Sequence, residues 1–79
     1  MFPLTITAID KVLFRGLVRR ATLPGIAGEL TVLKNHTPLI TLLKKGSIRI
    51  KIEGDKKEEI PLEKGFLSIH KNEVIVLVS

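Results

Sequence analysis

The feature that most constrains this chain is an alternation of apolar and polar side chains with a period of two residues. It is clearest over residues 47–53, where Ile48, Ile50 and Ile52 alternate with polar or charged neighbours. Successive side chains of a β-strand point to opposite faces of a sheet, so this segment predicts a strand with one buried and one wet face. Residues 54–55 then predict a hairpin turn, with Gly54 supplying a positive φ, before residues 56–60 resume as a strand.

Other segments of the chain show β-type patterns punctuated by glycine and proline. Strands are predicted over residues 5–9, 12–14, 17–23, 29–33, 65–70 and 73–78. Gly16 is expected to break the chain between two short strands. The last two segments predict a second hairpin with its turn at residues 71–72. Because residues 74–78 are all apolar, they predict a strand covered on both faces.

These patterns together predict an all-β fold with very little helix. Short strands separated by turn signals at intervals of about 8 to 12 residues are typical of a sandwich or barrel. The 79 residues can build only one core, so residues 1–79 are expected to form a single domain. The chain has no cysteine, which excludes disulfides and thiolate metal ligands.

Charge and hydropathy limit the possible environments of this domain. Thirteen Lys and Arg against eight Asp and Glu give a net charge of +5, which favours encounters with acidic partners. The longest apolar run is far shorter than the roughly 20 residues of a membrane-spanning helix. The first residues also lack the pattern of an export signal. The sequence therefore predicts a cytosol-facing domain that does not insert into a membrane.

The inventory of reactive side chains gives little support to catalysis. The two histidines, His36 and His70, have no second histidine or carboxylate at metal-ligand spacing, so both are interpreted as surface residues. The glycines at positions 25 and 28 lack the lysine and hydroxyl residue of a phosphate-binding loop, and they are interpreted as a turn. We therefore expect no enzyme activity, cofactor or metal.

A small basic β-barrel that binds single-stranded nucleic acid remains an alternative function. Such proteins combine a cationic groove with aromatic platforms for base stacking. Only three aromatic residues are present, Phe2, Phe14 and Phe66, and they are not interleaved with basic residues. The cations are spread along the chain, with Lys and Arg pairs interpreted as solvated strand ends.

Six short motifs keep the order and spacing of a known family. They are Phe14–Gly16, Pro24–Gly25, Gly28–Leu30, Asn35–Leu39, Gly46–Ile50 and Gly65–Leu67. In this arrangement the whole chain resembles the ε subunit of F-type ATP synthases. Thr31 stands where the family commonly has Gly, and Lys34 where it often has Pro, so the loop between these positions is expected to differ in detail.

The resemblance implies a flattened two-layer β-sandwich of about ten short strands and a role in the central stalk of the rotor. It implies a non-catalytic subunit that links the γ subunit to the c-ring and couples ion translocation to ATP synthesis. Glu29 and Leu30 match a loop that faces the c-ring, and His36, Pro38 and Thr41 match positions at or near the γ contact. The complex would lie peripherally on the cytoplasmic face of the bacterial inner membrane, or on an equivalent organelle membrane.

The resemblance also sets limits on what is expected. Full-length relatives continue into a C-terminal helical hairpin that restrains ATP hydrolysis and in some members binds ATP, so neither property is carried over to residues 1–79. The coupling ion, proton or sodium, depends on c-ring residues that this chain lacks. We further expect Glu29→Ala and His36→Ala to fold normally as loop substitutions, and Ile50→Asp not to fold because it places a charge in the core.

Overall fold

The computed structural model describes residues 1–34, 37–54, 56–71 and 73–79. Within them the chain forms nine strands, in agreement with the predicted all-β class. The strands are β1 (Phe2–Thr7), β2 (Val12–Val18), β3 (Arg20–Gly25), β4 (Gly28–Val32), β5 (Leu39–Leu43), β6 (Gly46–Lys51), β7 (Lys57–Leu62), β8 (Gly65–His70) and β9 (Glu73–Val78). No helix in this described part is long and apolar enough to cross a membrane.

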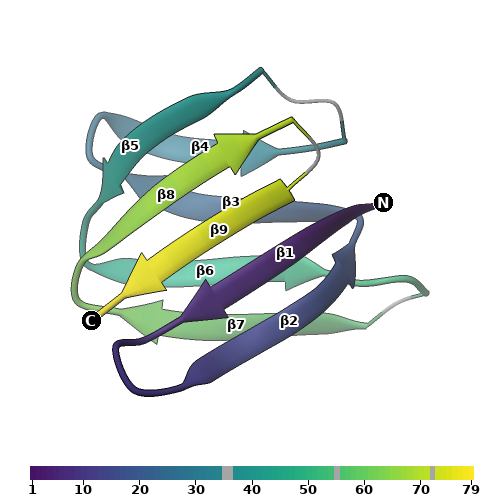
Figure 1. Ribbon diagram of the computed structural model, residues 1–79, viewed down its shortest axis with the longest axis horizontal. Coiled ribbons are helices and arrows are strands. Elements are labelled where there is room, and N and C mark those ends of the chain that lie inside the picture. The colour runs from purple at the N-terminus through teal and green to yellow at the C-terminus, as the bar shows by residue number, and fades with distance from the viewer. Residues whose placement is uncertain (35–36, 55, 72) are drawn as a thin grey trace.

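All nine strands belong to one sheet that folds over into two layers (Figure 1). The front layer, nearer the viewer, has the order β2-β1-β9-β8-β5, and the back layer contains β4, β3, β6 and β7. The layers are connected where Gly25 of β3 pairs with Leu43 of β5. Between the described strands every pairing is antiparallel except that of β1 with β9, which is parallel. The predicted two-layer sandwich is confirmed.

The core lies between the layers and is entirely apolar. The alternation seen in the sequence places Ile48 and Ile50 of β6 in this core, as predicted, while Arg49 points outward. Leu67 of β8 and Val76 of β9 face them from the front layer and are fully buried. Among the described residues no polar or charged side chain is buried, so packing rather than polar bonding holds the layers together.

Both predicted hairpins are present. β6 and β7 pair from Gly46 with Leu62 to Lys51 with Lys57, and Gly54 in the turn adopts a φ of 80°, the left-handed conformation that glycine tolerates best. β8 and β9 form the second hairpin, which closes with the pair His70 and Glu73. Residue 55 in the first turn and residue 72 in the second lie outside the described residues.

The predicted break at Gly16 was wrong, and one strand was missed. Gly16 does not break the chain, because β2 runs through it and the two strands separate at Arg19 instead. A bulge occurs earlier in β2, where Leu13 is left out of the register between Phe14 and Val12. β5 was not predicted, because residues 39–43 read as a nearly continuous apolar run without clear alternation.

Candidate functional site

An apolar row crosses the outer face of the front layer. Leu42 of β5 lies directly opposite Phe66 of β8, and Phe66 lies directly opposite Leu77 of β9. These three side chains are 53%, 37% and 50% exposed, and Ile40, also on β5, is 63% exposed. We call Ile40, Leu42, Phe66 and Leu77 the apolar row. They alternate with buried or half-buried residues of the same strands, so the sheet geometry turns all of them outward.

A shallow groove of about 430 Å³ runs beside the apolar row at one end of the sandwich. Most of its lining residues are apolar, and Lys64 and Ser79 also line it. The lining residues are Ile26, Leu42, Leu43, Lys64, Gly65, Phe66, Leu77, Val78 and Ser79. A contiguous exposed apolar surface of this kind is typical of a protein interaction site. It is less typical of a surface that faces only solvent.

The apolar row also corrects the prediction for the last strand. Residues 74–78 were expected to be covered on both faces, yet Leu77 is half exposed while Val76 and Val78 are buried. A strand of a two-layer sandwich has only one neighbouring layer, so its outer side chains meet solvent unless another molecule covers them. The apolar run predicted coverage of both faces of the strand, whereas the structure covers only the face that carries Val76 and Val78.

Two of the three residues predicted to contact γ, Pro38 and Thr41, lie beside or within β5. Pro38 is exposed immediately before this strand, and His36 lies outside the described residues. Thr41 is half-buried and belongs to the inward-facing set of β5, whereas its neighbours Ile40 and Leu42 face outward. The structure therefore places the two apolar neighbours of Thr41, rather than the Thr41 side chain itself, on the outer surface.

The residues predicted to contact the c-ring lie in a strand rather than in the expected loop. Glu29 and Leu30 are the second and third residues of β4, which pairs with β3 through Pro24 opposite Glu29. Leu30 is half-buried and packs against the core. Glu29 is exposed, but an Nη2–H of Arg49 donates a hydrogen bond of 2.6 Å to its Oε2 atom. Its carboxylate is therefore already engaged within the domain.

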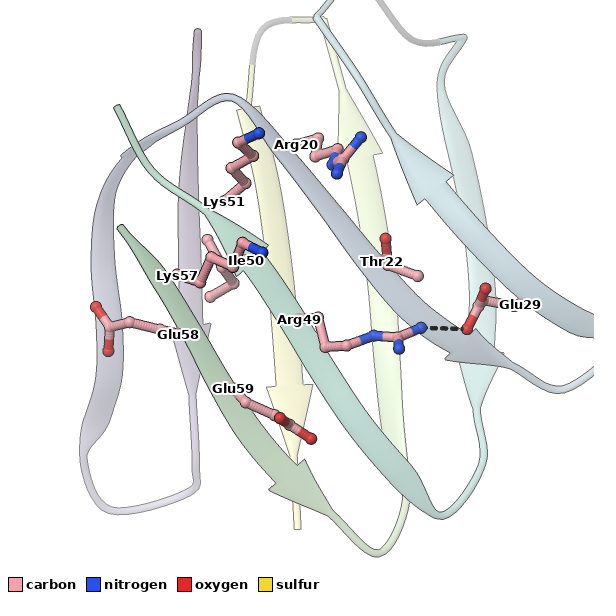
Figure 2. A pocket seen from close by; sticks show the side chains of 9 residues that line it. All are labelled: Arg20, Thr22, Glu29, Arg49, Ile50, Lys51, Lys57, Glu58 and Glu59. Atoms are coloured by element: carbon pink, nitrogen blue, oxygen red, sulfur yellow. Dashed lines mark hydrogen bonds and ion pairs between the residues drawn. The ribbon is translucent and has the colours of Figure 1, made fainter. Parts of the chain in front are cut away.

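The ion pair between Glu29 and Arg49 crosses β3 on the outer face of the back layer (Figure 2). Glu29 lies on β4 and Arg49 on β6, the two neighbours of β3, so the pair ties the β4 edge to the middle of the layer. Sequence reasoning missed Arg49, because the residues are 20 positions apart and are brought together only by the strand order. The second ion pair within the described residues, Lys45 with Glu63, is long at 4.0 Å.

We expect Arg49→Gln to destabilise the domain only slightly. Both side chains of the pair are more than half exposed, and exposed ion pairs contribute about 0 to 1 kcal/mol because water and salt screen them. The free energy of unfolding from urea titration should fall by no more than about 1 kcal/mol, and the difference should shrink in high salt. Combining Arg49→Gln with Glu29→Gln should add almost nothing, whereas fully additive losses would mean that the two side chains do not interact.

Among the described residues, one hydroxyl group lies close to an imidazole. The Oγ atom of Ser68 and the Nε2 atom of His70 lie 2.8 Å apart on β8. His70 is exposed and neither residue lines the groove beside the apolar row. No group of three or more metal-ligating side chains occurs among residues 1–34, 37–54, 56–71 and 73–79. The apolar row is suited to docking, because its side chains are apolar and exposed.

Comparisons with known proteins agree with this architecture. The family model of the ATP synthase Delta/Epsilon chain beta-sandwich domain matches residues 1–79. The ATP synthase epsilon chain of Brevibacillus brevis is 34% identical over 68 residues, which cover 86% of this chain and 52% of that relative. The chain thus spans about half the length of the curated relative that it matches.

Solved structures show the same fold. A chain in the Euglena gracilis mitochondrial ATP synthase structure, OSCP/F1/c-ring in rotational state 1, superposes with a TM-score of 0.89 and 26% identity, covering 95% of this chain and 48% of that one. A chain from the central stalk/c-ring of the Tetrahymena thermophila mitochondrial ATP synthase has a TM-score of 0.81 at 18% identity, over 96% of this chain and 61% of that one, and supports the fold alone. Fold, motifs and family match agree: the chain belongs to the family of ATP synthase delta/epsilon chain β-sandwich domains.

Proposed function

We propose that residues 1–79 act as one folding unit in the central stalk of an F-type ATP synthase, where the domain docks the γ subunit through the apolar row. The observation that carries this proposal is the alignment of Leu42, Phe66 and Leu77 in one register across three strands of the front layer. The family match and the likeness to chains of ATP synthase assemblies support the choice of partner.

Apolar area is the main source of affinity that this surface can offer. Burying exposed apolar surface contributes about 25 cal/mol per Å², whereas rim ion pairs contribute little. Of the predicted γ-contact positions, Pro38 directly precedes β5 and Thr41 lies within it, the strand that carries Ile40 and Leu42, while His36 lies outside the described residues. We therefore propose that the γ contact extends from this segment over the apolar row.

The proposed c-ring contact involves the end of the β3–β4 hairpin. Glu29 and Leu30 follow its turn, where Ile26 is 61% exposed. Because the Glu29 carboxylate is bonded to Arg49, we propose that this hairpin meets the c-ring through its shape and its exposed turn, with Glu29 holding the hairpin to the layer. The hydrogen-bonded sheet makes the whole domain stiff, which suits a part that turns with a shaft.

In this role the domain would be non-catalytic and would couple ion transport to ATP synthesis through contacts alone. No cofactor is proposed. The complex would be peripheral, on the cytoplasmic face of the bacterial inner membrane or the equivalent organelle membrane. The alternative of single-strand nucleic-acid binding has weaker support, because exposed Phe66 lies on the front layer while the neighbouring cations Arg20, Lys51 and Lys57 lie on the back layer.

Leu42→Asp tests the docking surface. It should leave the fold intact, because residue 42 points to solvent, and it should weaken the complex with the γ subunit about 10- to 100-fold by placing a charge in an apolar contact. Affinity can be measured by titration with purified γ, and folding by circular dichroism. Leu17→Asp is the matched control, since Leu17 is also an exposed leucine but lies on the edge strand β2.

Equal weakening by Leu17→Asp and Leu42→Asp would contradict the assignment of docking to the apolar row. The nucleic-acid alternative is checked with the same preparation and single-stranded oligonucleotides, where we expect no salt-sensitive shift. A strong shift in the absence of γ binding would favour that alternative.

A further inference from the structure

Three cations lie side by side on the outer face of the back layer. Arg20 of β3 is directly opposite Lys51 of β6, and Lys51 is directly opposite Lys57 of β7 (Figure 2). We call these three residues the cationic row. Side chains that face each other across antiparallel strands have Cβ atoms about 5 Å apart, so their charges repel. Among the described residues, no carboxylate lies within ion-pair distance of any of the three.

The cationic row lines a hollow of about 470 Å³. Thr22 adds a hydroxyl to this hollow, and Arg49, which also lines it, is engaged by Glu29. Besides Glu29, the acidic residues that line the hollow are Glu58 and Glu59 of β7. Glu59 lies directly opposite Arg49. The unpaired positive charge is therefore confined to a band one row wide, with carboxylates beside it.

The arrangement lowers the stability of the free domain and is suited to an anion. Directly opposed like charges are destabilising, and an anion seated between them would relieve the repulsion. Arg20 supplies a guanidinium group, and Lys51 and Lys57 supply ammonium groups. Both kinds of group recognise phosphate oxygens in proteins. The hollow has the size of a small-molecule site, whereas a stable protein partner would need about 800 Å² on this face. A long polyanion would also meet Glu58 and Glu59.

We propose that the cationic row binds a compact, multiply charged phosphate ligand of the diphosphate class, free in solution. Arg20, Lys51 and Lys57 would each donate to phosphate oxygens, and the Thr22 hydroxyl lies in the same hollow. This site is on the layer opposite the apolar row, so it goes beyond the stalk function and does not depend on it.

The test is a titration of the domain with inorganic pyrophosphate at low ionic strength, followed by amide NMR shifts. We expect saturable binding at one site with a Kd on the order of 1 mM, and with shifts centred on residues 20, 51 and 57. Lys51→Gln should weaken binding about tenfold. Without ligand, the same variant should melt about 1 to 2 °C higher, because it removes the central repelling charge.

Lys44→Gln is the matched control, because Lys44 is exposed, does not line the hollow and carries the same charge. Its Kd for pyrophosphate should stay within about twofold of that of the unsubstituted domain, since the lost charge is distant from the hollow and screened by salt. Absence of binding, or equal weakening by the two variants, would overturn the proposal. Binding through the cationic row to phosphatidylglycerol vesicles with none to pyrophosphate would also overturn it, by assigning the row to a lipid surface. Lys51→Gln should retain its complex with γ, which separates this test from that of the proposed function.

Discussion

Ile50→Asp is expected to leave the domain unfolded at 25 °C. Ile50 is 2% exposed and belongs to the core cluster, whose buried members among the described residues are all apolar. The substitution removes about 1.5 to 3 kcal/mol of apolar burial and adds the larger cost of burying an unpaired charge. A domain of this size has a free energy of unfolding of about 4 to 12 kcal/mol, which these two effects together can exceed. Far-UV circular dichroism and the dispersion of amide NMR signals will show the outcome.

Ile40→Asp is the matched control for this prediction. It makes the same chemical change on the opposite face of a strand, since Ile40 points outward from β5 and is 63% exposed. We expect it to fold with a change in unfolding free energy of about 0.5 kcal/mol or less. A cooperative thermal transition in Ile50→Asp, or its loss in Ile40→Asp, would show that the inward and outward faces have been assigned incorrectly.

Gly65→Ala is expected to lower the free energy of unfolding by about 3 kcal/mol, because there is no space for a methyl group at this position. A Cβ atom there would lie 2.8 Å from the carbonyl oxygen of Leu77 and 2.9 Å from a Cδ1 atom of Leu62. The carbonyl belongs to the ladder between β8 and β9 and cannot move without disturbing it. The melting temperature should fall by about 10 °C or more in a calorimetric scan.

Gly16→Ala provides the contrast. A Cβ atom at residue 16 would have its closest contact with the Phe14 ring at 3.6 Å, an ordinary van der Waals distance. This substitution should be neutral or slightly stabilising, because alanine restricts the unfolded chain more than glycine does. Equal destabilisation by the two substitutions would mean that crowding is not the reason for glycine at residue 65.

The sequence predicted the parts of the fold that depend on local periodicity. The alternation of Ile48 and Ile50 identified both the strand and its buried face, and Gly54 identified the hairpin turn. The sequence-based prediction of strands failed where the local residue pattern and the tertiary environment disagree. Gly16 looked like a break, yet β2 continues through it because the Phe14 ring lies over the position and β1 pairs alongside. β5 has outward leucine and isoleucine side chains, so its alternation is hidden.

The candidate site was less accessible to sequence reasoning than the fold. The family resemblance pointed to Glu29. Its ion-pair partner, Arg49, can be identified only from the strand order, in which β4 and β6 flank β3. The apolar row combines residues from three separate strands, and the register that aligns Leu42, Phe66 and Leu77 cannot be read from any one segment. The roles assigned to Pro38 and Thr41 stay predictions.

The parallel pairing of β1 with β9 has a consequence for how the chain folds as it is synthesised. β9 inserts between β1 and β8, so β1 has a free hydrogen-bonding edge until the chain has emerged as far as Val78. Long-range pairings of this kind form late, and unpaired edges of apolar strands recruit other chains. Translation that pauses before residues 73–78 are available should therefore favour aggregation of nascent chains, and complete release should suppress it.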